Sequence, residues 1–177
     1  MGVFQISAYG FHWINGTQDD SQDLCLHGHV TARIGDTLLE DSGTVSATGL
    51  YLLKTLTEDK IMNEWEVQMI PCCGHFLIPN DDLTEVSISG CPNGTDWSVV
   101  HEGENLKLIL PSGQEEVVSL GEYIPEVLAF AETVKAFYDA CTPKEIPADE
   151  FRRRGYQAFW NEWNRRYQDG QARQNTL

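Results

Sequence analysis

Cysteine and histidine form two short clusters that are the residues of this sequence best suited to metal or thiol chemistry. The two clusters supply Cys25, His27, His29, Cys72, Cys73 and His75. Thiolate and imidazole are ligands that Zn²⁺ prefers, in tetrahedral sites with bonds of roughly 2.0–2.3 Å. Neighbours of the first cluster on one strand face would stand roughly 6–7 Å apart, so a complete ligand set needs the second cluster. These residues predict a candidate zinc site, in a zinc-binding protein or a metal-dependent hydrolase.

Two other interpretations of the same residues stay open. The patterns CxHxH and CCxH do not match the CxxC and HxxxH spacings of common zinc folds. Because free cysteine is among the most buried residue types, a purely structural role is one alternative. A thiol enzyme is the other, with Cys72 or Cys73 as the nucleophile and His75 as the activating base.

Signatures of the common enzyme classes are missing from the chain. It contains no GxxxxGK[ST], GxGxxG, GxSxG or HExxH motif. The sequence therefore leaves open whether the protein is an enzyme and favours a non-enzymatic one.

Charge is distributed unevenly along the 177 residues, which carry a net charge of −15. The acidic excess lies almost entirely in residues 1–121, whereas residues 122–177 are nearly balanced. A negative field of this size repels nucleic acid and anionic lipid and attracts a basic protein. We therefore expect a basic protein partner at Asp81, Asp82 and Glu85, and no nucleic-acid or membrane ligand. Solubility alone is the alternative role of this charge.

The cysteine count and the chain start both bear on the cellular compartment. Five cysteines are an odd number, and the adjacent Cys72 and Cys73 could pair only in a strained disulfide. The first residues lack the basic and apolar run of a secretory signal, and no stretch reaches the ~18 apolar residues of a membrane span. These observations predict reduced thiols in a cytoplasmic protein.

Strand patterns dominate the chain up to residue 120. Apolar side chains alternate over residues 24–34, and Gly35 with Asp36 predicts a tight hairpin turn. Helical spacing over residues 45–57 predicts one internal helix. The other predicted strands cover residues 3–9, 11–14, 37–40, 65–69, 84–90, 95–101, 105–110 and 115–120.

Two helices are predicted to end the chain. The first covers residues 124–141, with Pro125 in its first turn, and the second covers residues 149–168 with Asp149 as its cap. The second carries an aromatic stripe that we expect to face the core, and arginines that we expect to be solvated.

Strands first and helices last predict an α+β fold. We expect a mainly antiparallel sheet of about six or seven strands, with one internal helix and two C-terminal helices packed on it. Residues 1–168 should form a single domain, and residues 169–177 a flexible tail.

Three runs of the sequence resemble those of an uncharacterised group of small bacterial proteins, a likeness that spans essentially the full chain. These runs are IPCCGH at residues 70–75, GCPNGTDW at 90–97 and GYQAFWNEW at 155–163. The resemblance implies no activity. In size, acidity and fold class the chain is also similar to bacterial immunity proteins, which neutralise a toxin by covering its basic surface. That second likeness implies binding of a basic protein partner.

Overall fold

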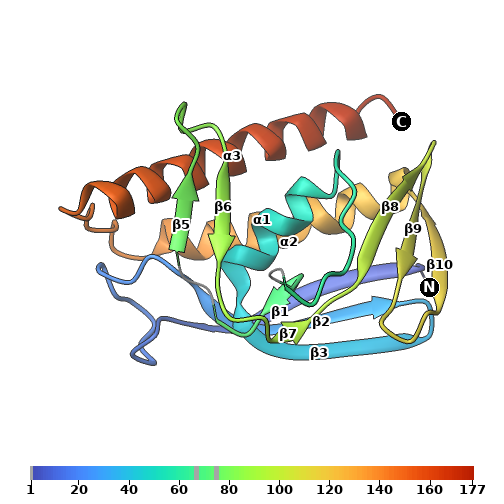
Figure 1. Cartoon of the computed structure of the whole chain (residues 1–177), viewed down its shortest axis with the longest axis horizontal. Helices are drawn as coiled ribbons and strands as arrows, with labels where there is room; N and C mark the ends of the chain where they lie inside the picture. The colour runs from blue at the N-terminus through green and yellow to red at the C-terminus, as the bar shows by residue number, and fades with distance from the viewer. Residues whose placement is uncertain (1, 66–67, 74–75) are drawn as a thin grey trace.

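The computed structural model describes residues 2–65, 68–73 and 76–177 and confirms an α+β fold (Figure 1). The strands are β1 (Phe4–His12), β2 (His27–Ile34), β3 (Thr37–Thr44), β4 (Ile70–Pro71), β5 (Phe76–Pro79), β6 (Val86–Ser89), β7 (Gly94–Thr95), β8 (Ser98–Glu102), β9 (Asn105–Ile109) and β10 (Glu115–Ser119). The helices are α1 (Val45–Lys54), α2 (Leu120–Ala140) and α3 (Glu150–Gln174). Within the described ranges, no helix has the length and apolar character needed to cross a membrane.

The strands form four small antiparallel sheets, where the sequence predicted one sheet of six or seven strands. Two sheets have three strands, in the orders β1-β2-β3 and β10-β9-β8, and two are the pairs β4-β7 and β5-β6. The predicted meander over residues 84–120 is confirmed for β8, β9 and β10. It is wrong for its first part, because β6 pairs with β5 and β7 pairs with β4, so neither pairs with the strand that follows it in the predicted meander.

The sheet β1-β2-β3 confirms the clearest pattern in the sequence. The even-numbered residues of β2 are buried, as expected for a strand with one face on the core. Gly35, at a φ of 57°, turns the chain so that Ile34 pairs with Thr37 of β3. His27 and His29 consequently lie on the less buried face of this strand.

The helices and the sheet β1-β2-β3 are stacked in layers (Figure 1). Helices α1 and α2 lie between this sheet and α3, and the strands of the pair β5-β6 pack against α3 and run across its axis. Trp13, Trp97 and Trp163 are among the largest fully buried side chains, and they come from three distant parts of the chain. One core therefore joins the N-terminal sheet to the C-terminal helix.

Helix α2 starts earlier than predicted. Ser119, the last residue of β10, is its N-cap, and the side chain of Ser119 accepts a hydrogen bond from the backbone N–H of Glu122 at 3.3 Å. Pro125 therefore lies inside the helix, and its predicted place in the first turn is wrong.

Helix α3 starts at the predicted cap, where the side chain of Asp149 accepts from the N–H of Arg152 at 2.8 Å. It continues to Gln174, past the predicted end at residue 168. Its last turns pack on the body of the protein, because Gly170 lies against Leu56 and Leu128. The flexibility of residues 169–177 stays a prediction.

The sequence analysis predicted that the aromatic residues of α3 face the core and that its arginines are solvated. The structure differs from this prediction at one arginine. Phe159 and Trp163 of the aromatic stripe are buried, as expected. Arg166 was expected to be solvated, but its side chain is 4% exposed and its guanidinium lies 2.7 Å from Glu162 and 2.5 Å from Glu58. A basic side chain of α3 is thus part of the interior.

The sequence predicted a strand over residues 65–69, and the three residues of this segment that the structure describes, Trp65, Gln68 and Met69, are not in a strand. Trp65 lies in a turn and is 83% exposed, and Val67 lies outside the described residues. The unpredicted strand β5 follows, and its Leu77 approaches α3 where Gly155 has no side chain. Gly155 of α3 therefore leaves room for β5, a strand that the sequence pattern did not predict.

Replacing Gly49 with alanine should destabilise the protein. A Cβ on Gly49 of α1 would overlap the indole ring of Trp163 from α3, and this ring is fully buried and confined. We expect Gly49→Ala to lower the free energy of unfolding by about 1–3 kcal/mol, as overpacking does elsewhere. Urea denaturation measures this change.

Gly121→Ala is the matched control, because Gly121 lies in the first turn of α2 and its nearest neighbour atom is 4.0 Å from an added Cβ. This change should leave stability unaltered or raise it by up to ~1 kcal/mol. Equal stability of the two variants would contradict the close packing of α1 on α3.

Candidate metal centre

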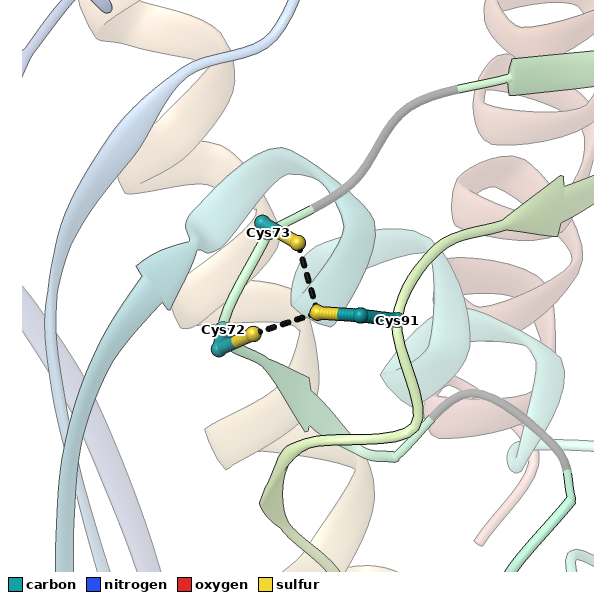
Figure 2. Close-up of side chains that lie close together, drawn as sticks. All are labelled: Cys72, Cys73 and Cys91. Atoms are coloured by element: carbon teal, nitrogen blue, oxygen red, sulfur yellow. Dashed lines mark hydrogen bonds between the residues drawn. The ribbon is translucent and has the colours of Figure 1, made fainter.

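Three cysteine thiols come together beside the end of β4 (Figure 2). The Sγ atom of Cys91 lies 2.7 Å from the Sγ of Cys72 and 2.7 Å from the Sγ of Cys73. One sulfur from each residue lies within 4.8 Å of the other two, and all three residues are half-buried. All three are free cysteines, so their thiols are available as ligands.

A short strand pair brings the two segments of the site together. Strand β4 pairs with β7, and the N–H of Cys72 donates to the carbonyl of Asn93 at 3.0 Å. This pairing places the residues that follow β4 beside those that precede β7, so Cys91 comes close to Cys72.

Cys72 and Cys73 are adjacent but reach the same neighbour. On a continuous strand their side chains would point to opposite faces. Strand β4 ends at Pro71, and the chain bends at both cysteines, which turns the two thiols toward Cys91 (Figure 2). The bend therefore creates a set of three sulfurs from two segments.

Two glycines allow the backbone around Cys72 to pack this closely. A Cβ on Gly43 of β3 would overlap the carbonyl of Pro71, and a Cβ on Gly94 of β7 would overlap the carbonyl of Ile70. Gly94 also has a φ of 135°, which side-chain-bearing residues rarely adopt. Strand β4, which immediately precedes Cys72, is thus fixed between two positions that require glycine.

The hydrogen bonds among the thiols act on their protonation in opposite directions. Hydrogen bonds with Cys72 and with Cys73 lower the pKa of Cys91. The hydrogen bond with Cys91, followed by burial, raises the pKa of Cys72 to about 12. Cys91 is therefore the sulfur in this pair that loses its proton first.

The residues of the predicted first cluster do not belong to the group of ligand atoms formed by these sulfurs. Within the described parts of the chain, the group close enough to hold one metal ion is made of cysteines 72, 73 and 91. His29 stacks on Tyr9 at 5.1 Å between ring centroids, and its Nδ1 lies 2.7 Å from the hydroxyl of Ser42. His75 lies outside the described residues, so its role as a ligand stays a prediction.

Cys25 and His27 share a pocket with one of the clustered cysteines. The pocket has a volume of about 490 Å³, and Cys25, His27 and Cys73 all contribute to its wall. Burial, with a smaller contribution from Asp23, raises the pKa of Cys25 to about 12. Burial also lowers the pKa of His27, although nearby Asp23 opposes that shift. A neutral thiol and a neutral imidazole are the forms that these shifts favour.

Sequence reasoning missed Cys91. It lies in the GCPNG segment, which the turn residues marked as a connection between strands. The signal available in the sequence was that two of the five cysteines, Cys91 and Cys141, were not among the candidate ligands.

Comparison with known proteins gives no match for this chain among family models, curated proteins or solved structures. The resemblances drawn from the sequence therefore stay predictions.

The acidic residues proposed for partner binding lie in the turn between β5 and β6. Asp81, Asp82 and Glu85 are all exposed. Glu85 forms an ion pair with Arg165 of α3 at 3.3 Å, and the guanidinium of Arg154 donates to the carbonyl of Asp81. The turn is thus held on α3 while the two aspartates face solvent.

Replacing Gly94 with alanine should disturb the site through the backbone. The alanine would have an unfavourable φ, and its Cβ would overlap the carbonyl of Ile70. Because β4 and β7 are paired, neither strand can move alone to remove this overlap. We expect Gly94→Ala to lower the free energy of unfolding by about 3 kcal/mol or more, measured by urea denaturation.

Gly113→Ala separates the two contributions, because Gly113 also has a positive φ, 84°, but nothing lies within 4 Å of an added Cβ. It should cost only about 1 kcal/mol of backbone strain. If both variants lost a similar amount of unfolding free energy, the close approach of β4 and β7 would not contribute to the effect of Gly94→Ala.

Proposed function

We propose that this protein binds Zn²⁺ through the thiolates of Cys72, Cys73 and Cys91. The observation that carries the proposal is the convergence of three free thiols within 4.8 Å of one another. Zinc–sulfur bonds of about 2.3 Å in a tetrahedral site require sulfurs roughly 3.8 Å apart. The two 2.7 Å contacts would therefore open by about 1 Å on binding, within reach of side-chain rotation.

The surroundings of the site favour a soft divalent cation. Thiolate ligands select zinc and other thiophilic metals over Mg²⁺ or Ca²⁺, which prefer oxygen. The net charge of −15 attracts cations to the protein as a whole. We place this function in the cytoplasm, where reducing conditions keep such thiols available.

Three protein ligands leave a fourth position on a tetrahedral zinc ion. A protein side chain there makes a structural site, and water or substrate makes a catalytic one. His75 follows Cys73 by two positions in the sequence and is the ligand that the sequence analysis predicts. Zinc retention by His75→Ala at reduced affinity would support that role, and unchanged affinity would assign the fourth position to water or another group.

Elemental analysis of the purified, untagged protein tests the proposal. We expect about one zinc ion per chain, and loss of most of it in Cys72→Ser, Cys73→Ser and Cys91→Ser. Each change removes one of three thiolates, so metal affinity should fall by a factor of ~100 or more. Competition with a chromophoric chelator measures the affinity.

Cys25→Ser and Cys141→Ser are the matched controls, because these free cysteines lie outside the three-sulfur group. Both should keep the full zinc content. Affinity should also fall as the pH drops, because protons compete with zinc for the thiolates. The proposal would be overturned if the wild-type protein held no zinc even after zinc was added to it. It would also be overturned if the control variants lost as much zinc as the variants of the three clustered cysteines.

Binding of a basic protein at the turn between β5 and β6 is our second proposal. It is supported by the solvent-facing carboxylates of Asp81 and Asp82, on a turn that the Glu85 ion pair holds on α3. A rigid acidic surface would speed association with a basic partner and make it sensitive to salt. This proposal is non-enzymatic and independent of the thiols.

Charge reversal tests this second proposal. We expect the combined variant Asp81→Lys, Asp82→Lys and Glu85→Lys to lose at least about tenfold in affinity for the partner, because complementary charges become repulsive. The measurement is quantitative affinity capture from lysate at low and high salt, followed by titration with the purified basic protein.

The control reverses Asp36 and Glu104, two exposed carboxylates in the β2-β3 and β8-β9 turns, which belong to other sheets than the turn between β5 and β6. It should retain the partner. Equal retention by both variants, or a captured protein that binds independently of salt, would contradict an interface at this turn.

A further inference from the structure

We infer that the pocket beside Cys73 binds a small organic carboxylate with an apolar aliphatic or aromatic body. The pocket encloses about 490 Å³, a volume within the usual range of small-molecule sites. It lies between the segment leading into β2, the start of β5 and the first turn of α3. The inference does not depend on the zinc proposal, although Cys73 belongs to both.

Part of the pocket wall is apolar and exposed to solvent. Ile14, Phe76 and Phe151 line it and are 74%, 63% and 45% exposed. Large exposed apolar side chains that gather around one cavity are a mark of a binding site, because exposing them together has a cost that a ligand removes. These three side chains fit the apolar body of a ligand.

A cation in the wall selects the charge of the ligand. Arg152 lines the pocket, and its described hydrogen bond is made by its backbone N–H, which donates to Asp149. Among the residues that the structure describes, no carboxylate forms an ion pair with the Arg152 guanidinium. This planar group presents a pair of N–H donors that matches a carboxylate.

The acidic residue in the same wall is already engaged. The carboxylate of Asp23 accepts the backbone N–H groups of Ile14 at 2.6 Å and Cys25 at 3.0 Å. It also lies 4.0 Å from Nε2 of His27. Asp23 therefore orders the wall, and the guanidinium of Arg152 stays the group available to a ligand.

A second pocket, of about 500 Å³ between α1 and β6, offers a useful contrast. Its two lysines are paired: Lys54 lies 3.1 Å from Glu162, and Lys60 lies 2.6 Å from Asp96. Those cations are neutralised by the protein itself. Charge complementarity therefore favours an anion in the pocket beside Cys73.

Nuclear magnetic resonance titration with phenylacetate and its neutral amide, phenylacetamide, tests the inference. Both probes should shift the amide signals of residues lining the pocket, because both carry the aromatic body. The acid should bind about tenfold more tightly than the amide, as expected for one charge-assisted contact with Arg152.

Variants separate the parts of the pocket. Arg152→Gln should reduce the affinity for the acid about tenfold, to that of the amide, while Arg153→Gln, an exposed neighbour on the same helix, should change neither. Phe76→Ala should weaken both probes. Cys72→Ser, which removes a proposed zinc ligand outside the pocket wall, should bind both probes normally, so failure of the zinc proposal is recognised separately.

Three outcomes would overturn the inference. The first is the absence of shifts at the pocket with millimolar phenylacetate. The second is equal affinity for the acid and the amide. The third is a preference for the acid that survives in Arg152→Gln.

Discussion

One buried carboxylate holds the main parts of the structure in place. Glu162 of α3 is fully buried, and it accepts the N–H of Val86 in β6 at 2.8 Å. Lys54 of α1 lies 3.1 Å from the same carboxylate, and the Nε of Arg166 lies 2.7 Å from it. Removing such a charge from water is very unfavourable unless several donors satisfy it. Helix α1, helix α3 and strand β6 can therefore pack in one arrangement, which provides all three donors together.

The position of the thiol cluster depends indirectly on this packing of α1, α3 and β6. Strand β6 is fixed on α3 by Glu162, and the chain that leaves β6 leads directly to Cys91. Cys72 is held from the other direction, between Gly43 of β3 and Gly94 of β7. Neither segment has an extensive ladder of its own, since β4 and β7 have two residues each. The site is thus positioned by packing against larger elements more than by local hydrogen bonds.

Periodicity predicted what repeats along the chain and missed what depends on distant contacts. The α+β class, the hairpin at Gly35, the cap at Asp149 and the burial of Phe159 and Trp163 in the aromatic stripe were predictable, because each has a local signal. The division into four separate sheets was not predictable, because strands of two residues, such as β4 and β7, are too short to show an alternation of apolar and polar residues. The approach of Cys91 to Cys72 and Cys73 was not predictable either, because the segment around Cys91 shows only the residues typical of a turn. A buried glutamate within an aromatic stripe also resembles a surface charge in sequence.

The position of Glu162 near the C-terminus has a consequence for synthesis of the chain. Two of the three groups that satisfy it, on Lys54 and Val86, are made long before it, whereas Arg166, and Trp163 which packs on Gly49, are made after it. Helix α3 also covers the β5-β6 pair (Figure 1). Until α3 has left the ribosome, the nascent chain therefore lacks the partners that complete these contacts, and the apolar surface that α3 covers stays exposed.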